Sequence, residues 1–207
     1  MLETFANMDS VTLWAFMAAS LVMYLTPGAD MMFTIASGIS GGPKAGLAAT
    51  VGVTFGLIAH ITLAAAGLAV LIAASPTALL VIRYAGAAYL VVLAYQAWTA
   101  KPVSDEVEGR ANILRAVRRG FLTNILNPKI ILFILAFLPQ FTTAEAGPIW
   151  QQIVILGVMF ATGGFLVVSM IGLSAGIVGA KLKQATGILN KIAAAIFGGL
   201  AAKLVFD

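Results

Sequence analysis

The sequence predicts an all-helical membrane protein, because of its composition and the length of its apolar stretches. Of its 207 residues, 61% are hydrophobic and only 10% are charged, whereas a soluble domain carries about 25% charged residues. The apolar stretches reach the length of about 20 residues that a helix needs to cross the hydrocarbon core. A transmembrane β-barrel would show alternating segments of about 10 residues, and the sequence has no such pattern. Most of the chain must therefore face lipid or other apolar helices.

Six apolar runs follow one another, and each is expected to form a transmembrane helix. The most polar stretch lies at 100–112, near the middle of the chain. We therefore expect one membrane domain made of two inverted three-helix repeats, 1–104 and 105–207, with discontinuous first and fourth helices. Five spanning segments remain an alternative, because two runs are interrupted. The runs cover 11–40, 45–74, 77–99, 113–138, 149–178 and 187–206, with loops at 139–148 and 181–190.

The placement of Lys and Arg predicts the orientation in the membrane. Nine of these residues lie in or beside the loops after the first, third and fifth runs, whereas only Arg83 and Lys203 lie on the opposite side. Since basic loops stay in the cytoplasm, we expect a multi-pass protein of the bacterial inner membrane with both termini outside. The same placement accounts for the net charge of +4 without a nucleic-acid partner.

The sequence lacks the residues and motifs on which common enzymes and metal proteins depend. It contains no cysteine, one histidine and eight carboxylates, which excludes disulfides and thiol chemistry and argues against a metal cluster. It also has no P-loop, HExxH motif or Gly-x-Ser-x-Gly elbow. No catalytic residue, metal site or cofactor is therefore expected.

Proline interrupts two of the runs near their middle. Proline inside a helix removes a hydrogen bond and clashes with the preceding turn, and in lipid the freed carbonyl groups need other partners. Each break is followed by an ionisable residue, which costs about 2.5–3.5 kcal/mol at membrane depth and is rarely kept without a partner or a task. The breaks read Thr26-Pro27-Gly28-Ala29-Asp30 and Asn124-Ile125-Leu126-Asn127-Pro128-Lys129.

The two breaks occupy corresponding places in the two halves, since Pro27 and Pro128 are 101 residues apart. Paired interruptions in inverted halves indicate a transporter's substrate site near the midplane of the membrane. The helix ends and Lys129 suit a carboxylate, and Asp30 suits an ammonium group, so the site fits an amino-acid zwitterion. The alternative is a purely structural ion pair between Asp30 and Lys129. The expected substrate-binding residues are Pro27, Gly28, Asp30, Asn124, Asn127, Pro128 and Lys129.

Other residues of the runs suggest proton coupling and helix packing. His60 lies near the middle of the second run and, with Asp30, is a candidate for carrying a proton; a hydrogen bond to a neighbouring helix is the alternative. Small residues let membrane helices approach closely, so glycines four residues apart are expected to pack helices within the chain. A homo-oligomer interface is the alternative. These glycines are Gly42/Gly46, Gly52/Gly56 and Gly172/Gly176.

Several landmarks follow one another along nearly the whole chain: TPGADMMF at 26–33, KAGL at 44–47, GAAYL at 86–90, GFLTN at 120–124 and FLPQF at 137–141. In this order they resemble the LysE/RhtB family of amino-acid efflux permeases. The resemblance implies a secondary transporter that exports amino acids from the cytoplasm, by proton antiport with alternating access. The family usually has a second proline where this chain has Ala29. Because alanine can continue a helix, the first break is expected to be less rigid here.

The expected partners are thus a small amino acid, protons and membrane lipid, and other functions fit the sequence less well. An efflux protein for metal ions, small ions or metabolites stays open, but metal efflux would call for several intramembrane carboxylates, and Asp30 is the only clear one. An intramembrane enzyme or redox carrier would need cysteine or a cofactor motif. A non-transporting assembly protein would need neither the charged residues nor the breaks.

Overall fold

The structure is a computed structural model of the chain that describes residues 1–74 and 113–206, together with positions 81, 84, 88, 91–92, 94–95 and 98–99 between them. Within these residues every regular element is helical, which confirms the predicted class. The helices are α1 (Leu2–Asn7), α2 (Ser10–Leu25), α3 (Ala29–Gly41), α4 (Pro43–Ala74), α6 (Ile113–Ile125), α7 (Pro128–Phe137), the short 3₁₀ helix η1 (Leu138–Phe141) and α8 (Ile149–Phe206).

Two helices are long and apolar enough to cross a membrane by themselves, over Pro43–Gly67 in α4 and over Ile149–Ile177 in α8. Two further pairs of helices meet the same criteria together, so that the described residues hold up to four candidate spans. The expected third run lies largely outside the described residues, as does the boundary between the two halves. Six spans and an inverted repeat therefore stay predictions.

Both predicted helix breaks are present. Ser10–Leu25 and Ala29–Gly41 are bent by 52° across the first break, and Ile113–Ile125 and Lys129–Phe141 by 58° across the second. Gly28 is the extended N-cap of α3, so Ala29 begins α3 instead of continuing α2. The break thus survives without the second proline. At the second break Pro128 is the first residue of α7, where its missing N–H group costs no helical hydrogen bond.

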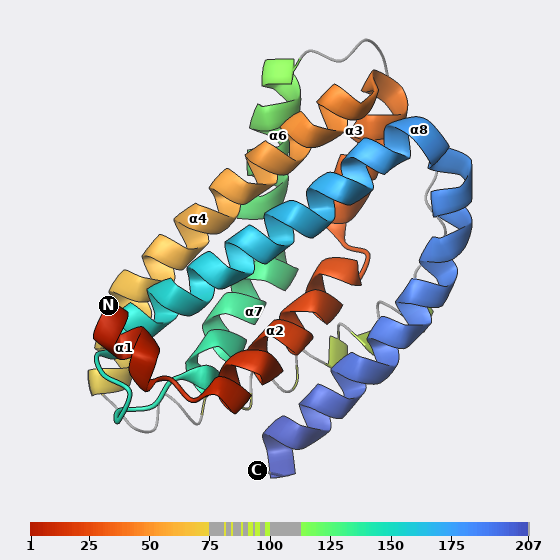
Figure 1. Ribbon diagram of the computed structural model, residues 1–207. Coiled ribbons are helices and arrows are strands. Elements are labelled where there is room, and N and C mark those ends of the chain that lie inside the picture. The colour runs from red at the N-terminus through yellow and green to blue at the C-terminus, as the bar shows by residue number, and fades with distance from the viewer. Residues whose placement is uncertain are drawn as a thin grey trace.

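The prediction of a loop at 181–190 is wrong, because α8 is helical throughout its 58 residues. At 1.5 Å per residue the path along this helix is about 87 Å long, almost three times the hydrocarbon thickness of about 30 Å. Figure 1 shows that its ribbon turns back in the second half. The segment 181–190 has no proline and contains the good helix formers Lys, Leu, Gln and Ala, so a helix can continue through it despite Gly187.

Helix α4 is central to the packing, since its most extensive contacts are with α6 and α8. In Figure 1, α4 and the first part of α8 run side by side, with α6 and α7 behind them. Glycine makes this proximity possible. A β-carbon at Gly46 would collide with the carbonyl group of Gly172, and one at Gly52 with that of Val117. These contacts confirm glycine packing within the chain, whereas Gly42 ends α3 with a φ of 78°, which only glycine adopts easily.

An aromatic stack fixes α7 against α8 beside the breaks. The ring of Phe133 stacks on Phe137 and on Phe160, with centroid distances of 4.6 and 4.8 Å. All three side chains are at least 96% buried. The start of α7, which carries the second break, is therefore held in place by well-packed aromatic side chains.

Candidate functional site

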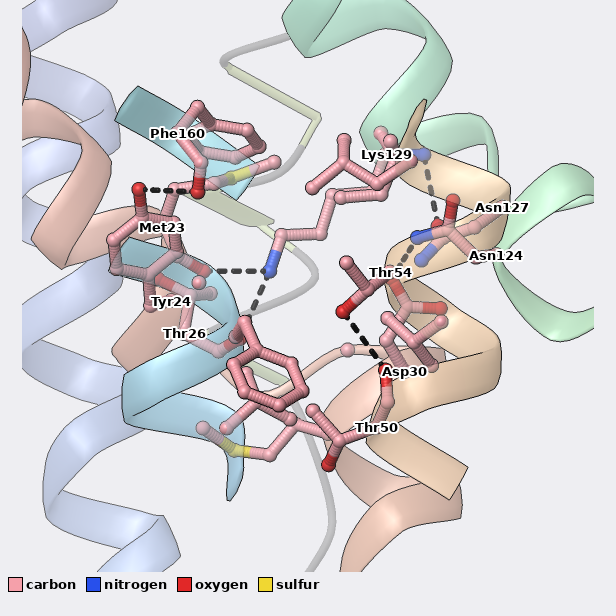
Figure 2. A pocket seen from close by; sticks show the side chains of 18 residues that line it. Met23, Tyr24, Thr26, Asp30, Thr50, Thr54, Asn124, Asn127, Lys129 and Phe160 are labelled. Atoms are coloured by element: carbon pink, nitrogen blue, oxygen red, sulfur yellow. Dashed lines mark hydrogen bonds between the residues drawn. The ribbon is translucent and has the colours of Figure 1, made fainter. Parts of the chain in front are cut away.

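A pocket lies where the two helix breaks meet (Figure 2). Its empty space, including the part that is open to the outside, amounts to about 540 Å³. Its wall is built from residues of α2, α3, α4, α6, α7 and α8 and of both breaks. Of the seven expected substrate-binding residues, the structure brings five together in this wall: Gly28, Asp30, Asn124, Asn127 and Lys129.

The ammonium group of Lys129 bridges the first break (Figure 2). It donates hydrogen bonds to the carbonyl oxygens of Thr26, at 2.8 Å, and of Met23, at 3.3 Å. Met23 is the residue four positions before Pro27, and a helix would bond its carbonyl oxygen to the N–H group that proline lacks. Lys129 thus replaces the hydrogen bond that the proline removes, and its positive charge lies at the negative end of α2.

Gly28 leaves the space through which the Lys129 side chain passes. A β-carbon at Gly28 would lie only 3.2 Å from both Cδ and Nζ of Lys129. The backbone of Gly28 is extended, with a φ of −150°, and any residue can adopt that conformation. Glycine therefore favours the close approach of the lysine side chain here, because a larger residue would press on it, and it is not required by an unusual backbone angle.

Asp30 is held by Asn124 and by the start of α3. The Asn124 side chain donates a hydrogen bond from Nδ2 to Oδ2 of Asp30, at 2.8 Å. Asp30 also lies in the first turn of α3, where the positive end of the helix stabilises an anion. The hydrogen bonds of Asp30 and Lys129 therefore go to different partners, although both charged groups line the same pocket.

Asn127 connects the second break to the same pocket. Its Oδ1 accepts a hydrogen bond from the backbone N–H of Lys129, at 3.0 Å, which makes it the N-cap of α7. The other side of the amide, Nδ2, belongs to a side chain that is 96% buried. The N-cap thus fixes which way the amide faces, with its N–H donors directed away from the helix end.

Three polar atoms of the pocket residues lack a hydrogen-bond partner within the described part of the chain: Asp30 Oδ1, Asn124 Oδ1 and Asn127 Nδ2. All three belong to side chains that are at least 91% buried. Buried polar groups in native proteins are nearly always hydrogen-bonded. The pocket therefore presents two acceptors, one of them charged, and one donor to a ligand.

His60 lies next to the pocket and not in its wall. Its Nε2 is 3.3 Å from the carbonyl oxygen of Asn124, the residue whose side chain binds Asp30. The predicted hydrogen bond between this histidine and a neighbouring helix is therefore present. Of the remaining expected site residues, Pro27 lies in the first break without lining the pocket, and the side chain of Pro128 is not among those described.

The sequence leaves open whether Tyr24 lines a cavity or lies at the membrane interface; it lines the pocket and donates its hydroxyl hydrogen to the carbonyl oxygen of Phe160, at 2.8 Å. Sequence reasoning missed two further contributors to the site. Gly56 provides space for Asn124, because a β-carbon there would lie 2.8 Å from Cβ and Oδ1 of Asn124. The carbonyl of Met23 could have been found from the sequence, since it lies four residues before a proline.

Comparisons of the sequence with known proteins identify its family. The sequence model of the family described as LysE type translocator matches residues 21–207. The chain is 35% identical to an uncharacterised membrane protein of Vibrio cholerae, over 75% of this chain and 76% of the relative. It is 33% identical to the homoserine/homoserine lactone efflux protein of Salmonella typhimurium, over 70% and 71% of the two chains. It is 29% identical to the leucine efflux protein of an Enterobacter species, over 97% and 98%.

No solved structure matches the chain. The family match covers almost the whole sequence, both helix breaks included, and the membrane helices found in the structure fit such a protein. The chain therefore belongs to the LysE family of translocators, which are membrane transporters and not enzymes.

Proposed function

We propose that this protein exports amino acids across the bacterial inner membrane and binds them in the pocket between the two helix breaks. The observation that carries the proposal is the set of three buried, unpartnered polar atoms in that pocket. The names of two relatives, a homoserine/homoserine lactone efflux protein and a leucine efflux protein, support amino acids as the substrate class.

The zwitterionic part of an amino acid matches these atoms in charge and in hydrogen-bonding type. Its ammonium group is a donor and would bind Oδ1 of Asp30 and Oδ1 of Asn124, which are acceptors. Its carboxylate is an acceptor and would bind Nδ2 of Asn127. A lysine ammonium has three N–H donors, and the bonds to Met23 and Thr26 use two of them. The third N–H of Lys129 would complete the carboxylate site.

Proton antiport would use Asp30 and His60. Both residues contact Asn124: Asp30 accepts a hydrogen bond from the Asn124 side chain, and His60 contacts the Asn124 backbone carbonyl group. Protonation of Asp30 would remove the negative charge that binds the ammonium group, and so release the substrate. His60 would be the neighbouring proton carrier, since an imidazole can take up and release a proton.

Alternating access would come from six helices in two inverted halves, with both termini outside. In such transporters one half moves against the other around a fixed site near the midplane. Lys129, from the expected second half, bonds to carbonyl groups of α2 in the first half. These bonds would form and break as the halves move.

The proposal is tested by transport in liposomes that contain the purified full-length protein and carry a pH gradient. The wild type is expected to move at least one amino acid. Asp30→Asn and Lys129→Gln should each reduce the rate about 10- to 150-fold, because a hydrogen bond to a charged group contributes about 1.5–3 kcal/mol. Matched controls are Asp9→Asn and Lys44→Gln, since both native side chains are exposed. Asp9 is the N-cap of α2, and asparagine is as good an N-cap as aspartate.

The outcomes distinguish an error in the assignment of the site from an error in the proposed function. If the Asp30 and Lys129 variants insert normally and transport as well as the two controls, the site assignment is wrong. If the wild type moves no amino acid under any imposed pH gradient, the proposed exporter function is wrong.

A further inference from the structure

We infer that the transported amino acid has an uncharged and mainly apolar side chain. This inference rests on the proposed function, since it concerns the remainder of the same pocket. Once the zwitterionic part of the substrate is placed against Asp30, Asn124, Asn127 and Lys129, the rest of the wall has to accommodate the side chain. The chemistry of that remaining wall selects the substrate.

The hydroxyl groups in the wall already donate to backbone carbonyl groups. Thr26, Thr50 and Thr54 each donate to the carbonyl oxygen four residues earlier, at 2.6, 3.2 and 2.9 Å. Tyr24 donates to the carbonyl oxygen of Phe160, at 2.8 Å. A hydroxyl has a single donor hydrogen, so these four groups have none left for an acceptor on the substrate side chain. A carboxylate or a carboxamide oxygen would therefore gain nothing from them.

The charged groups of the wall are also accounted for. Among the lining residues that the structure describes, Asp30 and Lys129 are the only carboxylate and the only ammonium group. Both are needed for the zwitterion, and each already bonds to protein groups. A substrate with a third charge, such as lysine or glutamate, would find no opposite charge in this part of the wall.

Apolar side chains from five helices form the rest of the wall. They are contributed by α2, α3, α4, α7 and α8 and include two aromatic rings, and most of them are buried. Such a surface favours a branched aliphatic or thioether side chain, because burying apolar area is favourable and polar groups would lose water without replacement. They include Met31, Val53, Leu57, Ile130, Phe160 and Phe165.

The expected discrimination is large. Placing an unpaired charge at membrane depth reduces the rate of transport, relative to that of a neutral substrate, by about 70- to 400-fold. A hydroxyl group on an otherwise small side chain reduces the rate of transport much less, because an apolar pocket rejects an added hydroxyl only moderately. The expected order is leucine first, then homoserine, with lysine and glutamate far behind.

The experiment compares initial rates for these four amino acids in liposomes that contain the wild-type protein under one pH gradient. A rate for lysine or glutamate within tenfold of the leucine rate overturns the inference, as does faster transport of homoserine than of leucine. Neither result would contradict export itself. Failure to move any amino acid contradicts the proposed function instead.

A variant of the partly buried Phe165 adds a second test. Phe165→Asp places a carboxylate in the apolar wall and should raise the rate for lysine relative to leucine at least tenfold. Phe165→Leu keeps the wall apolar and should preserve the wild-type order. An increase of less than tenfold in the ratio of the lysine rate to the leucine rate, in a normally inserted Phe165→Asp protein, would show that this wall does not contact the substrate side chain. The ranking by the wild type stands as a test even if Phe165→Asp fails to fold.

Discussion

Replacement of Gly56 by alanine tests whether the position of Asn124 controls transport. Gly56 lies in α4, opposite Asn124 in α6, and a β-carbon at Gly56 would lie 2.8 Å from both Cβ and Oδ1 of Asn124. Atoms cannot remain that close, so the added methyl group must push the Asn124 side chain away. That side chain holds Oδ2 of Asp30. A small change in a helix contact is thus transmitted to the charged group of the site.

The effect on stability should be small and the effect on transport large. Adding a methyl group to a tightly packed site costs about 1–3 kcal/mol, and alanine recovers up to about 1 kcal/mol over glycine in a helix. The net destabilisation is therefore about 0–2 kcal/mol. Loss of the bond from Asn124 to Asp30 costs about 1.5–3 kcal/mol of binding, which corresponds to a transport rate about 10- to 150-fold lower.

The assay pairs transport in liposomes with thermal unfolding in detergent, and Gly67→Ala is the matched control. Gly67 lies in the same helix, and a β-carbon there would meet no described atom within 4 Å. Gly67→Ala should keep full transport and either keep or slightly raise stability. The reasoning is refuted if Gly56→Ala transports as fast and unfolds at the same temperature as Gly67→Ala.

Two further substitutions separate roles that one side chain combines. Asn127→Ser keeps an oxygen for the N-cap of α7 but removes Nδ2 without adding a charge, so stability should be retained and transport lost, whereas Asn127→Ala should also cost about 0.5–2 kcal/mol of unfolding free energy. Wild-type transport by Asn127→Ser would show that Nδ2 does not bind substrate. His60→Gln keeps a donor for the carbonyl oxygen of Asn124 but cannot take up a proton near neutral pH. Exchange of amino acid at equal pH should persist in this variant and accumulation driven by a pH gradient should be lost; gradient-driven accumulation at the wild-type level would exclude coupling through His60.

The helix breaks could be predicted from the sequence because their cause is local. Pro27 and Pro128 lack the N–H group that a continuous helix needs, and the bends of 52° and 58° occur at these residues. The end of the chain was harder to predict. The polar residues at 181–190 suggest a loop, yet Lys, Gln and Ala among them are good helix formers and α8 continues through them. Polarity alone does not distinguish a helix from a loop.

The residues of the candidate site could also be predicted, but their partners could not. Their opposite charges at membrane depth leave two interpretations open, binding of a zwitterion or an ion pair between Asp30 and Lys129, and neither identifies the groups that hold these side chains. The structure bonds Lys129 to backbone carbonyl groups and Asp30 to Asn124. Backbone acceptors are present at every residue and leave no mark in the sequence. Only the position of Pro27 indicates which of them has lost its partner.

The bridge from Lys129 to α2 also bears on how the chain assembles during synthesis. The carbonyl groups of Met23 and Thr26 enter the bilayer first, and the ammonium group that binds them is made more than a hundred residues later. Until α7 is inserted, these carbonyl groups depend on water or on lipid head groups, since the hydrocarbon region offers no other donors. In a ribosome-bound chain that ends before residue 129, the positions of α2 and α3 should therefore be less fixed relative to each other than in the finished protein. Insertion of α7 then supplies the missing hydrogen bonds of the first break as well as forming the second.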